Sequence, residues 1–370
     1  MSPFQPRIDD VEVTAFEFPT PATEADATLE WESTTAVTVR VHAAGRSGLG
    51  WTYSSPAAAT LITTHFAPLL RGRVVADVAA AGATLQRTSR NFGIGGLAMH
   101  AMSAVDVALW DLKAKLLDVS LTALLGACRD RVPVYGSGGF LTSGDSELSQ
   151  DVAAWKAAGC RGMKIKIGHD GGAAPERDLE RVALFRELAR DGIELMVDAN
   201  GAYHSAQAIR LGRELERWDV HWFEEPVSSD DLEGLALARS GLGCDVAAGE
   251  YISTLYDAQR LAPVVDCLQA DATRCGGYTG FLHMATIAAA HNLDISAHCA
   301  PALHGPVAAA VPNLRHVEWF NDHVRLEPQL LDGVSPVYDG AIVVQNQRPG
   351  HGMTLSDDAQ LYRTAVGAGR

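Results

Sequence analysis

Eight short apolar runs alternate with amphipathic stretches after Gly126, and this alternation constrains the fold more than any other feature. Successive runs begin roughly 20 to 30 residues apart, which is the spacing of βα units. Eight such units in one run predict an α/β fold that closes into a (β/α)-barrel, whose catalytic residues lie at the carboxyl ends of the strands. The predicted strands are residues 132–140, 162–167, 195–199, 221–225, 246–250, 267–270, 294–297 and 316–319.

The part of the chain before the barrel has a different pattern. Val37, Val39 and Val41 alternate with polar residues, as in a half-buried strand, and a helical apolar stripe runs over residues 97–117. The polar stretch 19–31 is long enough for a mobile loop, and such loops can act as lids.

We therefore divide the chain into three segments. Residues 1–126 form an N-terminal α+β capping domain, and residues 127–340 form the catalytic barrel. Residues 341–370 form a C-terminal segment that returns to the capping domain, and we expect a strand at 341–344 to make this return.

Charge and cysteine usage narrow the class of protein. The formal net charge of the 370 residues is −15, which argues against nucleic acid or an anionic membrane as a partner, since both attract clustered Lys and Arg. No run reaches the ~18 apolar residues of a membrane span, and we see no signal peptide. The six cysteines include no CxxC pair, which indicates neither a zinc site nor a redox dithiol. We expect a reduced, cytoplasmic protein.

Three carboxylates follow three consecutive predicted strands. Asp198, Glu224 and Glu250 are spaced 26 residues apart, which is one βα unit each, so they should converge at one end of the barrel. Unpaired anions there would be costly, and a hard divalent cation is their natural partner. Oxygen-only ligation favours Mg²⁺, with Mn²⁺ as the alternative. Glu225 should point to the opposite face of a regular strand, and we do not count it as a ligand.

Two further pairs of polar residues lie on or just after other predicted strands. Lys164 and Lys166 share one strand face, and their mutual repulsion should lower both pKa values, which suits a lysine for base catalysis. Asp271 and His298 end the next two strands of the series, where the carboxylate would orient the imidazole and raise its basicity. Glu318, on the last strand, completes the ring.

Together these residues resemble the enolase superfamily, in its mandelate racemase/muconate lactonizing enzyme family. Three segments carry the resemblance: the helix beginning at residue 101 and continuing to Gly126, the stretch LMVDAN at 195–200, and FEEP at 223–226. The Lys-x-Lys strand and the Asp/His pair narrow it to the mandelate racemase subgroup. The resemblance covers about residues 10–365 and implies a modified TIM-like barrel, usually in a homo-oligomer.

The resemblance also implies a role for each matching residue. Asp198, Glu224 and Glu250 would bind Mg²⁺. Lys166 would be the base on one face of the substrate, and His298, oriented by Asp271, would act on the other.

The remaining roles concern the substrate itself. Lys164 would neutralise the substrate carboxylate, Glu318 would hydrogen-bond a carboxylate oxygen as the enediolate forms, and Asn200 would touch a substrate hydroxyl. Arg274 would support this region, and the cap would close the site and select the substrate.

These parts suit removal of the proton next to a carboxylate, because the developing charge falls on oxygens that the cation and Lys164 can stabilise. We favour dehydration of an acid sugar to a 2-keto-3-deoxy acid, in which Lys166 takes the α-proton and His298 protonates the leaving hydroxyl. A racemase or epimerase of a 2-hydroxy acid would use the same two bases, and the chain does not separate the two reactions.

Other classes fit less well. A muconate-type cycloisomerase would have a lysine after the sixth strand, and residues 267–277 contain none. A hydrolytic metal barrel would usually have a His-x-His pair on its first strand, and residues 132–140 contain no histidine. A non-catalytic, metal-binding barrel should have lost part of the site, whereas the main residues are all present.

Overall fold

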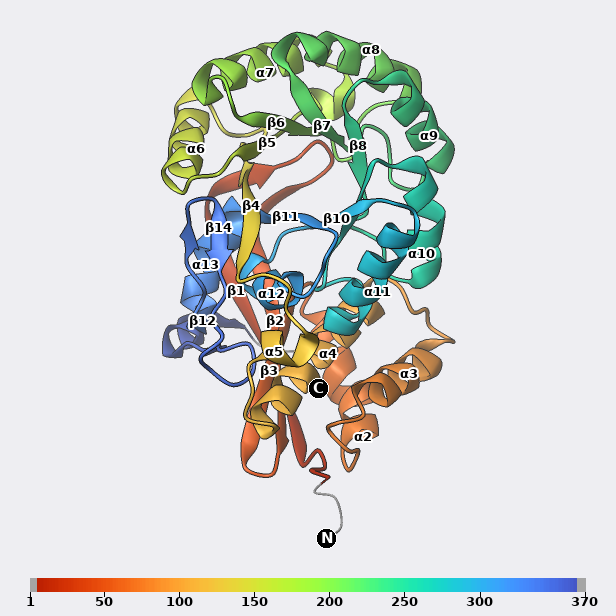
Figure 1. Ribbon diagram of the computed structural model, residues 1–370, viewed down its shortest axis with the longest axis vertical. Helices are drawn as coiled ribbons and strands as arrows, with labels where there is room; N and C mark the ends of the chain where they lie inside the picture. The colour runs from red at the N-terminus through yellow and green to blue at the C-terminus, as the bar shows by residue number, and fades with distance from the viewer. Residues whose placement is uncertain (1–4, 365–370) are drawn as a thin grey trace.

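The eight predicted strands form one closed barrel in the computed structural model, which describes residues 5–364 (Figure 1). Neighbouring barrel strands are parallel throughout, and the last strand pairs with the first, which closes the sheet. The predicted fold class is therefore confirmed. The barrel strands are β4 (Arg131–Gly138), β5 (Gly162–Lys166), β6 (Glu194–Asp198), β7 (Val220–Glu224), β8 (Asp245–Ala248), β9 (Cys267–Ala270), β10 (Asp294–Ala297) and β11 (Leu314–Phe320).

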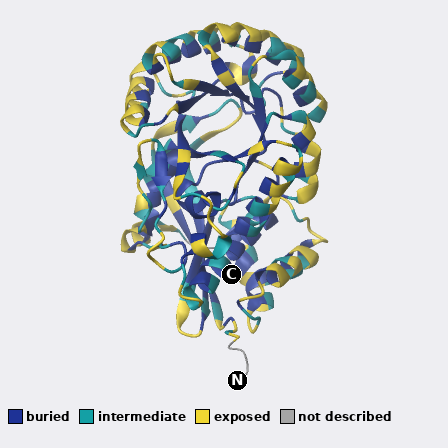
Figure 2. Ribbon diagram, viewed as in Figure 1, coloured by how far each residue is buried: buried dark blue, intermediate teal, exposed yellow. Residues whose placement is uncertain are grey.

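A helix follows each barrel strand and covers its outer face. The buried sides of these helices pack on the strands, and the exposed sides of all but the fully buried α12 form the rim of the ring (Figure 2). Because both faces of the strands are covered, most of their residues are buried, as is usual for parallel strands. These helices are α6 (Asp145–Ala157), α7 (Pro175–Ala189), α8 (Ser205–Leu215), α9 (Leu232–Gly241), α10 (Leu255–Leu261), α11 (Gly277–Ala290), α12 (Pro301–Ala308) and α13 (Asn321–Leu330).

The N-terminal part forms an antiparallel sheet with helices on one side. Its main strands are β1 (Asp10–Ala25), β2 (Glu30–Ala43) and β3 (Arg46–Tyr53), and the long helix α4 (Leu97–Leu116) packs against β3. A Cβ atom on Gly48 or Gly50 would lie 2.1 Å from a backbone oxygen of α4, so only glycine permits this close approach. The shorter helices are α1 (Ala57–Leu61), a π-helical turn (Ile62–Phe66), α2 (Ala67–Leu70), α3 (Val78–Ser89) and α5 (Leu121–Leu125).

The stretch 19–31 is a long β-hairpin, so the prediction of a loop there is wrong. β1 and β2 pair up to Ala25 and Glu30, with a register shift between Pro19 and Glu24 that accommodates the polar residues. The Asp26 carboxylate accepts hydrogen bonds from the backbone of the tip, which fixes a tight turn. In Figure 1 the red end of this hairpin reaches over the mouth of the barrel.

The C-terminal segment pairs with both parts of the molecule. The predicted strand is present as β14 (Ala341–Val343), but it pairs with β4 of the barrel, so its predicted return to the first domain is wrong. The reason is that the first residues of β4 extend beyond its barrel neighbours and leave an edge open. The short β16 (Arg363–Thr364) instead pairs with β1 of the capping sheet. The division at residues 126 and 340 stays a prediction.

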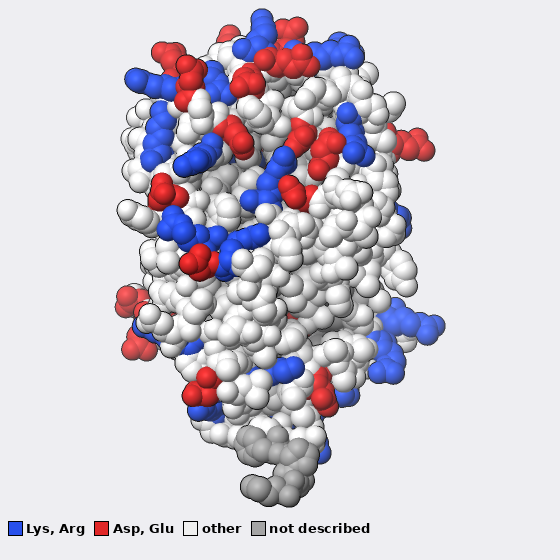
Figure 3. All heavy atoms as spheres, viewed as in Figure 1, with Lys and Arg blue, Asp and Glu red and all other residues white. Residues whose placement is uncertain are grey.

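Two surface properties bear on the expected partners. Within residues 5–364, no helix combines the length and the apolar character needed to span a membrane. On the face shown in Figure 3, basic and acidic side chains are interspersed over the barrel rather than segregated by sign. The remaining short strands are β12 (Leu331–Asp332), β13 (Val337–Tyr338) and β15 (Thr354–Leu355).

Candidate active site

The polar residues at the strand ends lie at one level of the barrel because the strands are in register. Lys166 of β5 is paired with Asp198 of β6, and Asp198 is paired with Glu224 of β7. Parallel strands that end together place their last side chains around one point. The three residues are buried, so the barrel mouth holds a set of enclosed charges.

The three predicted metal ligands meet at this point. Asp198, Glu224 and Glu250 each offer a carboxylate oxygen, and these oxygens lie within 4.8 Å of one another. Burial, together with nearby Asp198, raises the pKa of Glu224 to about 7 even though Lys164 opposes the shift. Among the described residues, Oε2 of Glu250 is buried without a hydrogen-bond partner. Converging carboxylates with an unused oxygen fit a hard divalent cation such as Mg²⁺.

The two lysines lie on one flank of this triad. Nζ of Lys166 is 2.5 Å from Oδ2 of Asp198, and Nζ of Lys164 is 2.6 Å from Oε1 of Glu224 and 2.9 Å from Oε1 of Glu318. The prediction that repulsion lowers the pKa values of both lysines is wrong for this arrangement. Burial lowers each pKa, but the carboxylates in contact outweigh it, so the net pKa shift of both lysines is upward.

His298 and Asp271 lie on the opposite flank, beside Glu250. Nδ1 of His298 is 3.0 Å from Oδ2 of Asp271 and donates to it, since an ionised carboxylate only accepts. Nε2 then faces Glu250, at 3.4 Å from its Oε2. Although burial lowers it, Glu250 and Asp271 raise the pKa of His298. Burial raises the pKa of Asp271, but the hydrogen bond from His298 and the nearby Arg274 hold it well below its usual range.

Glu318 connects the two flanks. Its Oε1 accepts from Oγ of Ser137 at 2.6 Å and from Lys164, and its Oε2 accepts from the backbone N–H of Cys299 at 2.8 Å. Burial raises the pKa of Glu318, but Lys164 and His298 outweigh it and keep this pKa well below the usual range. An ionised carboxylate with both oxygens occupied orients its neighbours and has no proton to give to a substrate.

A cavity of about 440 Å³ opens onto both flanks. Among the residues predicted for the site, Lys166, Asn200, Glu250, Arg274 and His298 line it from the barrel. The capping sheet supplies the opposite wall. Its lining residues are Asp26, Leu29, Trp31, Ser33, Thr34, Thr35, Tyr53, Ser54 and Ser55.

Three residues near the site were underestimated or missed from the sequence. Glu225 has a φ of 35° after the strand ends, so the regular alternation of the strand does not extend to it. It is buried, and burial together with nearby Glu250 raises its pKa, but it is not part of the group of converging carboxylates among the described residues. Arg274 is 3.3 Å from Glu250 and 3.5 Å from Asp271, so it stabilises both carboxylates. Cys299 contacts His298, and only its adjacency to His298 could have indicated this contact.

Comparisons with known proteins agree with this arrangement. Residues 10–126 match the family model "Mandelate racemase / muconate lactonizing enzyme, N-terminal domain", and residues 147–359 match "Enolase C-terminal domain-like". A mandelate racemase/muconate lactonizing enzyme-like protein from Rubrobacter xylanophilus superposes with a TM-score of 0.94 at 42% identity, covering 97% of this chain and 100% of that one.

Two relatives with named activities match over most of their length. L-talarate/galactarate dehydratase of Salmonella typhimurium is 34% identical over 86% of this chain and 79% of its own. Its structure liganded with Mg and L-lyxarohydroxamate has a TM-score of 0.90 at 30% identity, covering 98% of this chain and 94% of that one. 3,6-Anhydro-alpha-L-galactonate cycloisomerase of Streptomyces coelicolor is 33% identical over 97% of this chain and all of its own.

Proposed function

This chain belongs to the mandelate racemase/muconate lactonizing enzyme family of the enolase superfamily, and from that membership we propose that it dehydrates an acid sugar. The reaction is Mg²⁺-dependent removal of the proton α to a carboxylate, followed by loss of the β-hydroxyl as water to give a 2-keto-3-deoxy acid. The dehydratase relative, which matches over 86% of the chain, supports this choice of substrate class.

One observation carries the proposal. A nitrogen base lies on each flank of the acidic triad, Lys166 against Asp198 and His298 against Glu250, and both line one cavity. A substrate held over the triad would therefore have one base on each face of its α-carbon. Two bases on opposite faces can remove a proton from one side and handle a leaving group from the other.

The first step is removal of the α-proton by neutral Lys166. A divalent cation held by Asp198, Glu224 and Glu250 would polarise the substrate carboxylate and offset the carboxylate charge that raises the pKa of the lysines. The ammonium of Lys164 supplies a buried positive charge beside the same site. The C–H electron pair passes onto the carboxylate, and the proton resides on Nζ of Lys166.

The second step is departure of the β-hydroxyl. His298, as an imidazolium, gives its Nε2 proton to the hydroxyl oxygen, and the C–O bond breaks as the α,β double bond forms. Asp271 keeps the ring in the orientation that presents Nε2 and favours its charged form. Water leaves, and the enol product takes up a proton to become the keto acid.

Glu318 receives a positioning role and Asn200 a substrate-binding role. We assign Glu318 to holding Lys164 and the backbone of Cys299, in place of the direct hydrogen bond to substrate expected from the resemblance. Asn200 lines the cavity, and its Oδ1 is buried without a hydrogen-bond partner among the described residues. That oxygen is available to a substrate hydroxyl.

A second candidate reaction is an isomerisation of a cyclic acid sugar. The Streptomyces cycloisomerase favours it, since the match extends over the whole of that protein. If the leaving oxygen is part of a ring, the same proton abstraction opens the ring and the product keeps the mass of the substrate. Racemisation or epimerisation is a third outcome of the same two bases.

The test is turnover of the purified chain with Mg²⁺ on a library of mono- and diacid sugars, read by mass and by a carbonyl-specific reagent. A keto acid lighter than its substrate by one water supports dehydration. A product of unchanged mass, or deuterium uptake from D₂O without loss of water, identifies an isomerase or a racemase. No turnover on any member would favour the non-catalytic metal-binding barrel. A homo-oligomeric state and a cytoplasmic location also remain part of the proposal.

A further inference from the structure

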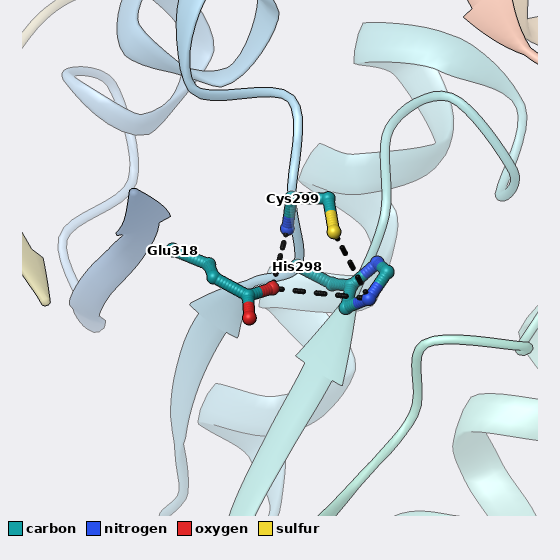
Figure 4. A group of neighbouring side chains, drawn as sticks. All are labelled: His298, Cys299 and Glu318. Carbon is teal, nitrogen blue, oxygen red and sulfur yellow. Dashed lines mark hydrogen bonds and ion pairs between the residues drawn. The ribbon is translucent and has the colours of Figure 1, made fainter. Parts of the chain in front are cut away.

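Figure 4 shows a group of three different donor types, His298, Cys299 and Glu318. The group adjoins the acidic triad, because Nε2 of His298 is also 3.4 Å from Oε2 of Glu250. Sγ of Cys299 is 3.2 Å from Nε2 of His298, and Oε2 of Glu318 is 3.8 Å from the same nitrogen. The three donor atoms lie within 4.8 Å of one another, and all three residues are buried. The mechanism above uses the imidazole but gives the thiol no role.

The backbone after β10 brings these side chains together. Successive residues of a strand point to opposite faces, yet His298 and Cys299 both line the cavity. Cys299 has a φ of 51° and Ala300 a φ of 43°, so the chain turns sharply at this point. The turn is held by two hydrogen bonds, from Cys299 N–H to Glu318 and from Ala300 N–H to Nδ1 of His323. The donors are therefore fixed in place by the fold.

Their spacing is close to that of the ligands around a tetrahedral zinc ion. Zinc bonds of about 2.0 Å to nitrogen, 2.1 Å to oxygen and 2.3 Å to sulfur give donor separations of roughly 3.4 to 3.6 Å. The observed separations from Nε2, 3.2 Å to sulfur and 3.8 Å to oxygen, lie on either side of that range. Small side-chain rotations would bring the three donors onto one ion. A fourth ligand can come from solvent, because His298 and Cys299 line the cavity.

We propose that His298, Cys299 and Glu318 form a second metal site, which takes Zn²⁺ and softer divalent ions such as Cd²⁺ and inhibits the enzyme when filled. The ligand sets separate the two sites, since Mg²⁺ prefers the three carboxylates and a thiolate with an imidazole prefers Zn²⁺. On binding, the thiol of Cys299 gives its proton to solvent and its sulfur binds as thiolate.

The inhibitory effect rests on the proposed function. In the proposed reaction, Nε2 of His298 carries the proton that goes to the leaving group. A metal bound to Nε2 occupies the lone pair that would hold this proton, so His298 can no longer act as the acid. Metal binding itself does not depend on any substrate, so the site can be tested separately from turnover.

The binding test uses the full chain with saturating Mg²⁺, titrated with Cd²⁺ while the ultraviolet thiolate-to-metal absorption is followed. We expect one equivalent to bind and Zn²⁺ to displace it. Cys299→Ala should abolish the band and weaken Zn²⁺ binding by more than about 100-fold, since losing a direct ligand costs more than the 10- to 100-fold of an outer-shell partner. Cys128→Ser, which removes an exposed thiol, is the matched control and should bind normally.

X-ray absorption of the Zn²⁺-loaded wild-type chain gives a check that needs no variant, in case Cys299→Ala fails to fold. One sulfur ligand supports the second metal site. Nitrogen and oxygen ligands alone would mean that zinc binds to the acidic triad, and this result would overturn the proposal. A band that disappears in Cys128→Ser and persists in Cys299→Ala would overturn it too.

The turnover test compares each variant with its own rate in Mg²⁺ alone. Half-inhibition of Cys299→Ala should need more than about 100-fold more Zn²⁺ than wild type, in line with the loss of a ligand. Equal sensitivity of the two proteins would overturn the inhibitory role. If no acid sugar is turned over, the proposed function fails, and the absorption experiments still decide whether the metal site exists.

Discussion

The two flanks of the acidic triad hold their bases in different ways. On the lysine flank, Lys166 contacts Asp198, which is also a proposed metal ligand, so one carboxylate serves both the base and the cation. On the histidine flank, His298 has a carboxylate of its own, Asp271, in addition to its contact with the triad through Glu250. The protonation of Lys166 should therefore follow the state of the triad, whereas the orientation of His298 is built into the fold.

This difference assigns a separate proton transfer to each flank. The pKa of Lys166 should fall when a cation neutralises the triad. Neutral Lys166 would therefore be available only in the metal-loaded enzyme, which suits the first proton removal. Glu250 and then Asp271 raise the pKa of His298, so its imidazole stays charged to higher pH, which suits donation to the leaving oxygen. Substitutions on each flank should then have separable effects.

The largest effect should come from Lys166→Ala. Removing the first base should lower turnover by about 10³- to 10⁴-fold and also stop exchange of the α-proton with D₂O, because both need the same proton removal. Lys156→Ala, at an exposed lysine of α6, is the matched control and should leave both rates unchanged. Exchange that survives in Lys166→Ala would mean that the histidine flank removes the proton, and the comparison would be reversed.

His298→Asn should have a smaller and more selective effect. Dehydration should fall by about 10²- to 10³-fold because the leaving hydroxyl loses its proton donor. Exchange of the α-proton with D₂O should continue, since Lys166 remains. The exposed His283→Asn on α11 is the control. Equal loss of exchange and dehydration would show that the two flanks do not act separately.

Asp271→Asn tests whether the second carboxylate of the histidine flank matters. Turnover should fall by about 10- to 100-fold, as for other partners that orient a functional histidine. The hydrogen bond from His298 to Asp271 raises the pKa of His298, so its loss lowers that pKa. If His298 is the charged acid, as proposed, the decline of kcat at high pH should move to lower pH.

A pH profile of kcat for wild type, Asp271→Asn and the exposed control Asp191→Asn measures this shift. An unchanged profile with reduced kcat would give Asp271 a purely structural role. A shift toward higher pH would contradict the assignment of His298 as the acid.

The placement of the residues on both flanks could be predicted from the sequence because it follows the strand period. Each barrel strand contributes the residue at its carboxyl end, and parallel register brings these residues to one level. Spacing alone therefore grouped Asp198, Glu224 and Glu250 correctly. The strand limits were also within a few residues of those observed, since apolar runs in a parallel sheet are continuous.

What could not be predicted depends on positions where the period breaks. Glu225 and Cys299 both have positive φ just after a strand, and no pattern of apolar residues signals such a turn. The pKa values of the lysines required knowing which carboxylates touch them, not only that two ammonium groups share a face. The hairpin over the barrel depends on contacts between distant segments, such as Leu141 N–H donating to the carbonyl of Ala25.

The smallest predicted effect comes from a substitution in that hairpin. It tests whether the cap contributes equally to the reactions at both flanks. Trp31 packs edge-on against Phe140 of the barrel with ring centroids 5.4 Å apart, and its Nε1 donates to Glu24 at 2.9 Å. Trp31→Ala should raise KM by about two- to tenfold, the equivalent of one aromatic pair, and leave kcat nearly unchanged. The rise should be the same for dehydration and for α-proton exchange, because the cap closes over one cavity that both bases line.

Two variants separate packing from hydrogen bonding in this effect. Trp31→Phe keeps a ring against Phe140 but loses the bond to Glu24, so its KM should lie between those of wild type and Trp31→Ala. Glu32→Ala, at the exposed neighbouring position, should match wild type. If Trp31→Ala instead changed the KM for α-proton exchange and left the KM for dehydration unaffected, the cap would act on the lysine flank alone. The two flanks would then differ in how they contact the substrate as well as in how their bases are held.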